Sequence, residues 1–572
     1  MSQSRACCAI CQAVAIWLVL FGLLVGARYY TFGSAIVHDE GVFLYGGMAW
    51  AAGEVAYRDF WDHKPPGITL FHAIPIRLFG HSLLAVRLHE VFWLAVSATI
   101  FLYLCRAHLS AGPAILSLLF FALFVSMKLV IRSGGLTEES ALTFHALSYL
   151  FALRRRGSLK SNFFLAGLFL GLAAQFRQPF GLSIVFIVLC LLWRPRGCEV
   201  ALKRRIAVLP ILAVGAALPE AVSSGYFALR GIWPEYIEAS YLFNFLYMGG
   251  GPDALGLGDG LQKHWEMLKA TGPYFLSPAL VIPLVWWLPA RLRRVGVLMI
   301  VAFLCDSVAI SLGGRYYEHY YLQATISSSF LLGLMFQAMY EGLRPRVVRG
   351  RASQLPGPLR RGKTLRGVYL VSCILVGGLV LEICTASTAG AIKRYIRQYK
   401  AELGNRRQPT GELRTERALG KAIRTITEPD ERILLLGASP TSVYFASGRL
   451  AGSRYYHLSP FFRKAFAQSM RKRHRERFLS DLKRRRPVLI ILAREERQIY
   501  FAGIEVVENS AAAFLVPYLE EEYVSLEDFY PRSKIRETLW WTWYGRICSF
   551  RIRKDKVEEM KRRIQRAESE EL

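Results

Sequence analysis

The sequence predicts a polytopic α-helical membrane protein with an α/β domain at its C-terminal end. Apolar residues make up 53% of the 572 residues and the mean hydropathy is +0.27, although the last third of the chain is polar. This mixture is typical of a multispan membrane part joined to a soluble part. The net charge is +29, and much of it lies in short loops between apolar runs, which favours membrane orientation over nucleic-acid binding.

About eleven apolar runs are long enough, or nearly so, to cross a bilayer, since a spanning helix needs about 20 apolar residues. We expect the first run to be an uncleaved span, because it is long for the apolar part of a signal peptide. The predicted spans are residues 9–29, 83–105, 112–130, 138–153, 162–177, 179–193, 206–229, 273–289, 295–312, 321–340 and 367–388.

Basic loops follow the fourth, sixth, eighth and tenth runs, at residues 154–160, 194–205, 291–294 and 341–366. If the spans alternate, all four loops lie on one side, which the positive-inside rule makes cytoplasmic together with the N-terminus. We therefore expect a membrane domain at residues 1–390 and an extracytoplasmic α/β domain at residues 391–572. The outward segments are then residues 30–82, 131–138, 230–272 and 313–320.

The first outer segment, residues 30–82, holds most of the candidate chemistry. It contains Asp39, Glu40, Asp59, Asp62, His63 and Lys64 beside a membrane, where charge is costly. Residues 41–52 and 66–79 are expected to form helices that lie flat on the membrane. A purely structural interpretation remains open: the acidic pair would favour a helix start, and the lysine would extend toward the interface.

The tail contains two apolar runs of strand length, residues 432–437 and 487–493, around a basic helical stretch at residues 461–486. Residues 551–572 are expected to form a solvated charged helix. An aromatic run at residues 539–544 suits either a membrane interface or the domain's own core. In the membrane domain, the glycine-rich residues 249–260 suit either a mobile lid or a slack connector.

The first outer segment resembles a known family. An Asp-Glu pair directly after the first span, followed by Gly-Glu-Val-Ala-Tyr-Arg-Asp-Phe-Trp-Asp-His-Lys-Pro-Pro at residues 53–66, is similar to bacterial membrane glycosyltransferases of the GT-C class. These are relatives of the protein O-mannosyltransferases and the lipid A aminoarabinose transferases, grouped as glycosyltransferase family 39. Gly-Gly-Arg-Tyr-Tyr-Glu-His-Tyr-Tyr at residues 313–321 resembles a late outer-loop motif of the family.

The resemblance implies transfer of a sugar, with inversion, from a polyprenyl phosphate to an acceptor hydroxyl at the outer face of a bacterial inner membrane. Inversion needs a carboxylate base and a positive charge that holds the leaving phosphate. By its match to the family's first acidic position, Asp39 is the candidate base, and Glu40 would orient the base or the acceptor. The candidate phosphate ligands are Lys64, Arg315, His319 and Arg177.

Four further carboxylates, Asp59, Asp62, Glu138 and Glu139, are candidates for binding the acceptor or a divalent cation. Oxygen ligands of this kind suit Mg²⁺ or Mn²⁺, although no cofactor is specified by the sequence. We also expect the tail to cap the outer cavity and help select a lipid, glycan or protein acceptor. Alternative functions are a transporter or flippase of lipid-linked glycans and a non-catalytic scaffold that binds an envelope polymer.

Overall fold

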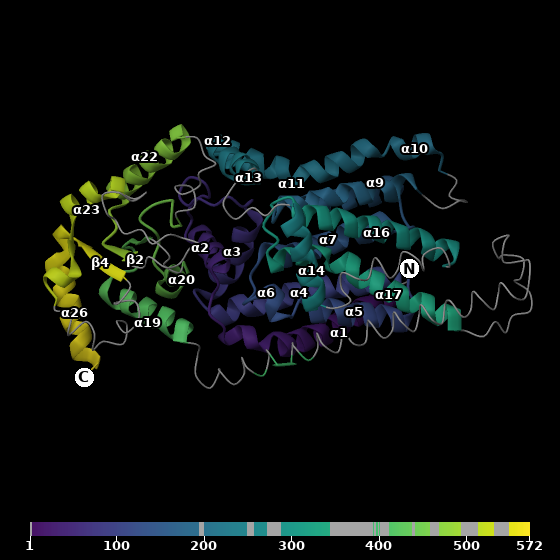
Figure 1. Cartoon of the computed structure of the whole chain (residues 1–572), viewed down its shortest axis with the longest axis horizontal. Helices are drawn as coiled ribbons and strands as arrows, with labels where there is room; N and C mark the ends of the chain where they lie inside the picture. The colour runs from purple at the N-terminus through teal and green to yellow at the C-terminus, as the bar shows by residue number, and fades with distance from the viewer. Residues whose placement is uncertain are drawn as a thin grey trace, which may run out of the picture.

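A computed structural model describes residues 3–193, 200–248, 257–271, 288–343, 411–436, 441–457, 468–493, 513–530 and 548–571, together with residues 393, 396, 397 and 400. A bundle of long helices occupies one end of the molecule and a small α/β domain the other (Figure 1). The first outer segment, with α2 (His38–Ala51) and α3 (Gly67–Phe79), lies between them. This arrangement confirms a polytopic helical membrane protein that carries a C-terminal α/β domain.

Nine of the eleven predicted spans coincide with helices of the bundle, while residues 273–287 and 367–388 lie outside the described residues. Within the described ranges, four helical stretches are long and apolar enough to cross a membrane: Cys11–Gly33, Leu83–Arg106, Leu202–Leu229 and Ala290–Ser311. The helices of the bundle are α1 (Gln3–Arg28), α4 (Leu83–Arg106), α5 (Ala111–Phe124), α7 (Thr137–Leu153), α8 (Leu159–Ala174), α9 (Ile184–Leu192), α11 (Leu209–Leu229), α16 (Ala290–Ser311) and α17 (Thr325–Leu343). Shorter helical pieces connect them: η1 (Tyr29–Gly33), α6 (Lys128–Ile131), η2 (Gln178–Ser183), α10 (Leu202–Ile206) and η4 (Glu318–Ala324).

The closest helix pairing in the bundle joins α8 to α11 through glycines. A Cβ atom at Gly167 would lie 2.9 Å from the backbone nitrogen of Ala216, and one at Gly171 would lie 3.0 Å from Pro219. Gly215 meets the α8 backbone in the same way from the other side. Small residues allow helix backbones to approach each other in a membrane, where apolar side chains gain little by association.

The helix α2 differs from the sequence prediction in two ways. It begins at His38 rather than residue 41, so Asp39 and Glu40 lie inside its first turn. Ten of its fourteen residues are buried, because it packs between α3 and the tail helix α20 (Ser442–Ser447). The prediction that this helix lies flat on the membrane is therefore wrong, since it offers no apolar face to lipid. By contrast, α3 exposes Leu70, Ile74 and Leu78, as an interfacial helix would.

The tail forms a four-stranded sheet in the order β1-β2-β4-β3. The predicted strands appear as β1 (Ile433–Leu436) and β2 (Leu489–Ala493), which pair in parallel. β4 (Cys548–Arg553) and β3 (Tyr523–Ser525) complete the sheet in antiparallel pairing. The helices are α19 (Gly411–Ile426), α20, α22 (Gln468–Arg485), α23 (Val516–Glu522) and α26 (Val557–Glu571).

Two sequence predictions for charged or glycine-rich segments need correction. Residues 551–553 belong to β4, and the following helix α26 buries Met560 and Ile564 rather than being fully solvated. Residues 257–260 begin the helix α14 (Leu257–Thr271), whereas residues 249–256 lie outside the described part of the chain. The aromatic run at residues 539–544 also lies outside it.

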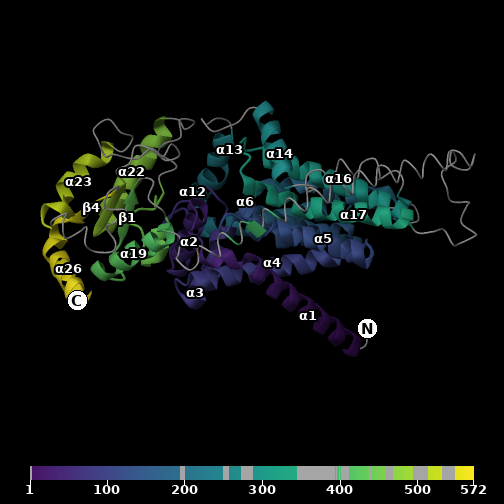
Figure 2. The same ribbon diagram turned by 60° about the horizontal axis from the view of Figure 1, so that its bottom comes forward.

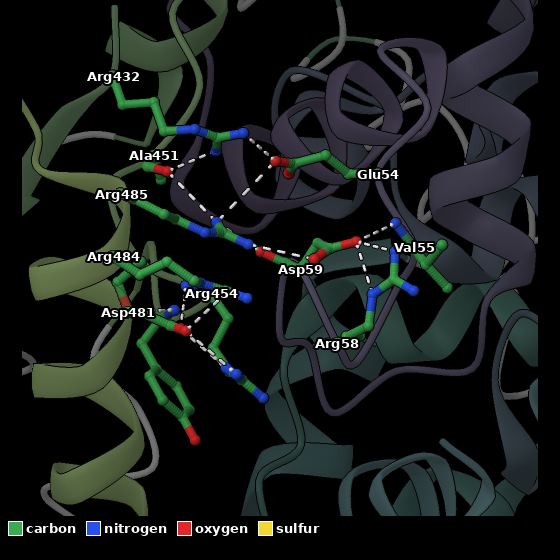
Figure 3. Close-up of polar contacts among 12 residues, drawn as sticks. Glu54, Val55, Arg58, Asp59, Arg432, Ala451, Arg454, Asp481, Arg484 and Arg485 are labelled. Carbon is green, nitrogen blue, oxygen red and sulfur yellow. Dashed lines mark hydrogen bonds and ion pairs between the residues drawn. The ribbon is translucent and has the colours of Figure 1, made fainter. Parts of the chain in front are cut away.

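The tail docks directly on the first outer segment (Figure 2). The Tyr45 ring of α2 lies 4.8 Å from the ring of Tyr444 and 4.0 Å from that of Tyr456, and its hydroxyl accepts a hydrogen bond from the Ala451 backbone at 3.0 Å. Figure 3 shows the ionic edge of the contact, where Arg432 pairs with Glu54 at 2.6 Å and Arg485 with Asp59 at 3.3 Å. The tail is thus packed against the helix that carries Asp39.

Candidate functional site

Charged side chains from distant parts of the membrane domain meet beside the first outer segment. They come from the first turn of α2, the turn before α3, the start of α7, the junction of α8 with η2, and η4. The members are Asp39, Lys64, Glu138, Arg177 and His319, which we call the charged cluster. Lys64 interacts electrostatically with Arg177, Glu138 and Asp39, and His319 interacts with Glu138, Asp39 and Arg177.

Asp39 is a half-buried carboxylate that lies near basic side chains. Burial alone would raise the pKa of Asp39, but the nearby His319, His38 and Lys64 hold that pKa below its ordinary value. Asp39 is therefore ionised at neutral pH. A ligand anion that neutralises the charge of Lys64 would make the Asp39 carboxylate a stronger base, because its ionised form would lose the stabilisation by that charge.

Lys64 and Arg177 supply cationic groups to the cluster. Burial lowers the pKa of Lys64, and the neighbouring Arg177 lowers it further, while Glu138 raises it. The buried guanidinium of Arg177 lies 2.9 Å from Glu138 and stacks 3.6 Å above the centre of the Tyr320 ring. A planar guanidinium held on both sides in this way is well suited to bind phosphate oxygens.

His319 reaches the charged cluster from the late outer loop, which also carries Arg315. His319 is buried, and burial lowers its pKa although Glu138 and Asp39 oppose the shift, so the ring is neutral near pH 7. Arg315 is buried in the turn before η4, where Gly314 and Tyr316 adopt φ angles of +60° and +50°. Both residues therefore remain candidates for binding a phosphate.

Arg132 is a functional candidate that sequence reasoning missed. It interacts electrostatically with Asp39 and His319, and its guanidinium lies 3.2 Å from Glu318. A lone arginine in a short outer loop is indistinguishable from ordinary surface charge. The signal that could have found it is the Gly134-Gly135 pair that follows, since paired glycines mark a tight turn at a close approach.

Glu40 and Glu139 belong to a buried ion network instead of the charged cluster. Glu40 lies 2.6 Å from Arg87 of α4 and accepts a 2.5 Å hydrogen bond from Ser133, and Glu139 pairs with Arg28 of α1. Gly135, with a φ of +71°, lies against this network, where a Cβ atom would be 2.9 Å from Glu90. The network joins α1, α2, α4 and α7, so Glu40 supports the helix that carries Asp39.

Asp59 and Asp62 also have separate partners. Asp59 pairs with Arg58 at 2.7 Å and with Arg485 of the tail, at the edge of the domain contact. Asp62 lies 3.3 Å from the His63 ring and accepts a 3.2 Å hydrogen bond from the Lys64 backbone, so it shapes the turn that carries Lys64. Among the residues that the structure describes, no group of three or more His, Cys, Asp or Glu side chains is arranged to hold a metal ion.

Comparisons with known proteins agree with this architecture. Residues 63–222 match the family model described as dolichyl-phosphate-mannose-protein mannosyltransferase, a range that includes Lys64, Glu138 and Arg177. The fold is similar to two crystal structures of ArnT from Cupriavidus metallidurans. The apo structure is 16% identical, with a TM-score of 0.50, over 78% of this chain and 86% of ArnT.

The second ArnT structure, bound to undecaprenyl phosphate, is 14% identical, with a TM-score of 0.51, over 77% of this chain and 85% of ArnT. No curated protein sequence matches the chain. The family match and the shared fold confirm the resemblance seen in the first outer segment. The chain is a membrane protein with the GT-C fold of ArnT, and part of it matches the family model of the protein mannosyltransferases.

Proposed function

We propose that the protein is an inverting glycosyltransferase that moves a hexosyl or pentosyl unit from a polyprenyl-phosphate donor to a hydroxyl group of a cell-envelope acceptor. The observation that carries the proposal is the charged cluster, in which Lys64 and Arg177 lie near the carboxylates Asp39 and Glu138. Arg132, which pairs with Glu318, adds a third cationic side chain beside Asp39. Lysine and arginine side chains gathered in this way are suited to bind a phosphate.

In the proposed reaction, Asp39 accepts the proton of the acceptor hydroxyl as its oxygen attacks the anomeric carbon. The bond between that carbon and the phosphate oxygen breaks, and the polyprenyl phosphate leaves with the bonding electrons. Lys64 and Arg177 stabilise the charge that develops on the leaving phosphate. Because the phosphate occupies their charge, donor binding raises the basicity of Asp39 at the moment when a base is needed.

The related proteins support the donor class. The matching family model is described by a dolichyl-phosphate-linked sugar, and one ArnT structure holds undecaprenyl phosphate. We infer that the reaction occurs at the outer face of a bacterial inner membrane. The basic loops between spans would then face the cytoplasm together with the N-terminus, and the tail would be extracytoplasmic.

The test is mass spectrometry of envelope glycans and glycolipids from a null strain and from strains rescued with wild type or Asp39→Asn. We expect one sugar to disappear in the null strain and to return only with wild type. General base catalysis contributes about 10²- to 10⁴-fold, so the variant should lose at least about a hundredfold in transfer rate. Asp555→Asn, an exposed tail residue paired with Arg553, is the matched control and should restore the sugar.

Full restoration by Asp39→Asn would exclude Asp39 as the base. An accumulation of lipid-linked sugar on the cytoplasmic side, with no loss of transfer in membranes supplied with donor, would instead indicate a transporter. The amount of folded protein in the membrane should be equal for the two variants, which separates a chemical defect from poor insertion.

A further inference from the structure

A short helical segment outside the charged cluster forms hydrogen bonds to the chain segments that carry Lys64 and Arg177. Residues 233–248 comprise α12 (Trp233–Ile237), the π-helical turn η3 (Glu238–Leu242) and α13 (Phe243–Met248), and we call them the π segment. π-helical turns are rare in proteins overall, but those that occur often lie at functional sites. None of the predicted site residues lies in this segment, and its contacts suggest why it has this form.

The π segment holds the turn that carries Lys64 at two points. The Asn244 amide nitrogen Nδ2 donates to the His63 carbonyl oxygen at 2.6 Å. The Ser240 hydroxyl donates to the Tyr57 hydroxyl at 3.0 Å, which in turn donates to the Lys64 carbonyl oxygen at 2.9 Å. Tyr57 is buried with a φ of +68°, a conformation that a bulky residue adopts only when its surroundings impose it.

The same segment reaches the stretch that carries Arg177. The Gln178 amide nitrogen Nε2 donates to the Ser240 carbonyl oxygen at 2.7 Å, and that oxygen also accepts from Asn244 at 2.7 Å. The Ser240 carbonyl oxygen therefore accepts hydrogen bonds from both Asn244 and Gln178. Asn244 also binds the turn that carries Lys64, and Gln178 is the residue after Arg177. A shift of this one backbone group would move both cations.

The tail anchors the π segment from its other side. Glu238 lies 3.1 Å from both His474 and Arg473 of α22, and Glu235 lies 3.4 Å from Arg477. In Figure 1 one end of α22 lies beside α12 at the junction of the two domains. The π segment is thus held by the tail through Glu235 and Glu238 and by the membrane domain through Ser240 and Asn244.

We propose that Tyr57, Ser240 and Asn244 are positioning residues that set the spacing of Lys64 and Arg177 for a polyprenyl-linked phosphate. The inference rests on the proposed function and extends it to residues that touch neither donor nor acceptor. It predicts that their loss weakens recognition of the phosphate group specifically, and leaves the binding of the polyprenyl chain unchanged.

The test measures binding of undecaprenyl phosphate and of undecaprenol, which lacks the phosphate, to the full-length protein in lipid nanodiscs. Tyr57→Phe and Asn244→Ala should raise the Kd for undecaprenyl phosphate about three- to tenfold, the range expected for lost hydrogen bonds. The Kd for undecaprenol should not change. Tyr236→Phe is the matched control, because that ring lies 5.2 Å from the Tyr57 ring but its hydroxyl donates to Glu220 at 2.8 Å.

Two results would overturn the positioning role while the proposed function stands. One is an unchanged Kd for undecaprenyl phosphate in both variants when Lys64→Gln raises that Kd strongly. The other is equal weakening of binding for undecaprenyl phosphate and undecaprenol, which indicates a general structural effect. If wild type binds undecaprenyl phosphate no better than undecaprenol, or Lys64→Gln binds like wild type, the donor assignment fails and the positioning role fails with it. Should Asn244→Ala not fold, Tyr57→Phe decides alone, since it removes a single oxygen atom.

Discussion

Arg177 is held in the charged cluster by two different kinds of contact. Its guanidinium pairs with Glu138 at 2.9 Å and stacks on the Tyr320 ring at 3.6 Å. A lysine ammonium can replace the charge but neither the planar stacking nor the two-pronged hydrogen bonding. The position is therefore sensitive to a substitution that preserves charge.

We predict that Arg177→Lys weakens binding of undecaprenyl phosphate about tenfold or more, measured by titration in nanodiscs. Arg230→Lys is the matched control, because this exposed arginine also lies over a tyrosine ring, that of Tyr226 at 5.5 Å, outside the charged cluster. Equal affinity of Arg177→Lys and wild type would show that the arginine is a structural anchor of α7.

Lys64 gives the site a predictable dependence on alkaline pH. Burial and the neighbouring Arg177 lower the pKa of Lys64 below 10.5, so the free protein loses this positive charge earlier than an exposed lysine would. Phosphate affinity is fully present below the pKa of Lys64 and is lost as pH rises through it. Arginine remains charged throughout this range.

We therefore predict that the affinity of wild type for undecaprenyl phosphate already declines at pH values below 10.5, while that of Lys64→Arg stays nearly constant over the same range. The ionisation of the ligand phosphate affects both proteins equally, so their ratio isolates Lys64. Parallel pH profiles would mean that Lys64 does not contact the phosphate.

The residues of the site were only partly predictable from their own sequence neighbourhoods. Asp39 and Lys64 were identified because the motif that contains them resembles a family, and Glu138, Arg177 and His319 because they lie at outer span ends or in the late motif. Glu40 and Glu139 have the same residue types and spacing but pair with Arg87 and Arg28. Sequence patterns predict that a charged residue lies at the membrane edge. They do not predict its ion-pair partner, because that partner lies on another helix.

The helix α2 packs directly against the tail, and Gly41 lies at this contact. A Cβ atom at Gly41 would lie 2.8 Å from the backbone nitrogen of Ser442 in α20, a contact that a flexible side chain cannot relieve. The same turn carries Asp39 and accepts a 3.3 Å hydrogen bond from Thr441 at the His38 carbonyl. The smallest residue is thus needed where the helix start meets the tail.

We predict that Gly41→Ala separates α20 from α2, lowers the melting temperature of the purified protein by several degrees and decreases transfer. Gly22→Ala in α1 is the control, because a Cβ atom there has no neighbour within 4 Å. Differential scanning fluorimetry in detergent provides the comparison. Unchanged melting and activity in Gly41→Ala would indicate that the tail can shift without consequence for α2.

At the level of elements, long apolar runs were predictable and short pieces were not. The spans follow from about 20 apolar residues in a row, and β1 and β2 from continuous aliphatic runs. The three-residue strand β3 and the arginine-containing strand β4 contain no continuous aliphatic run. They need none, because β1 and β2 already supply the aliphatic core of the sheet. The Gly167-x-x-x-Gly171 pattern of α8 did carry a signal for the contact with α11.

At the scale of the whole molecule, the tail and the first outer segment form one packed unit. Buried residues of α2, among them Val42 and Tyr45, share a single apolar core with β1, β2 and α20. Glu54 and Asp59 complete the contact through Arg432 and Arg485. Composition could divide the chain into membrane part and tail, but their joint core depends on contacts between residues about 400 positions apart, which composition does not encode.

Because the tail and α2 share one apolar core, removal of the tail should affect donor binding and transfer as well as acceptor use. If the tail were an independent cap for acceptor selection, deletion of residues 391–572 would change acceptor use and leave donor binding intact. The structure instead leads us to expect that α2 loses its cover, with Tyr45 exposed and Glu54 deprived of its 2.6 Å partner. Because α2 carries Asp39, and the π segment loses its anchor on α22, both transfer and undecaprenyl phosphate binding should fall.

Deletion of residues 557–572 is the matched control, because α26 packs within the tail, through α19 and the pairing of Arg563 with Glu431 at 2.6 Å. That shorter protein should retain donor binding, measured again with undecaprenyl phosphate in nanodiscs. A stable protein without residues 391–572 that binds the donor normally and prefers a different acceptor would restore the cap model. Joint loss of donor binding and transfer, with normal binding by the shorter truncation, would make the tail a structural part of the catalytic domain.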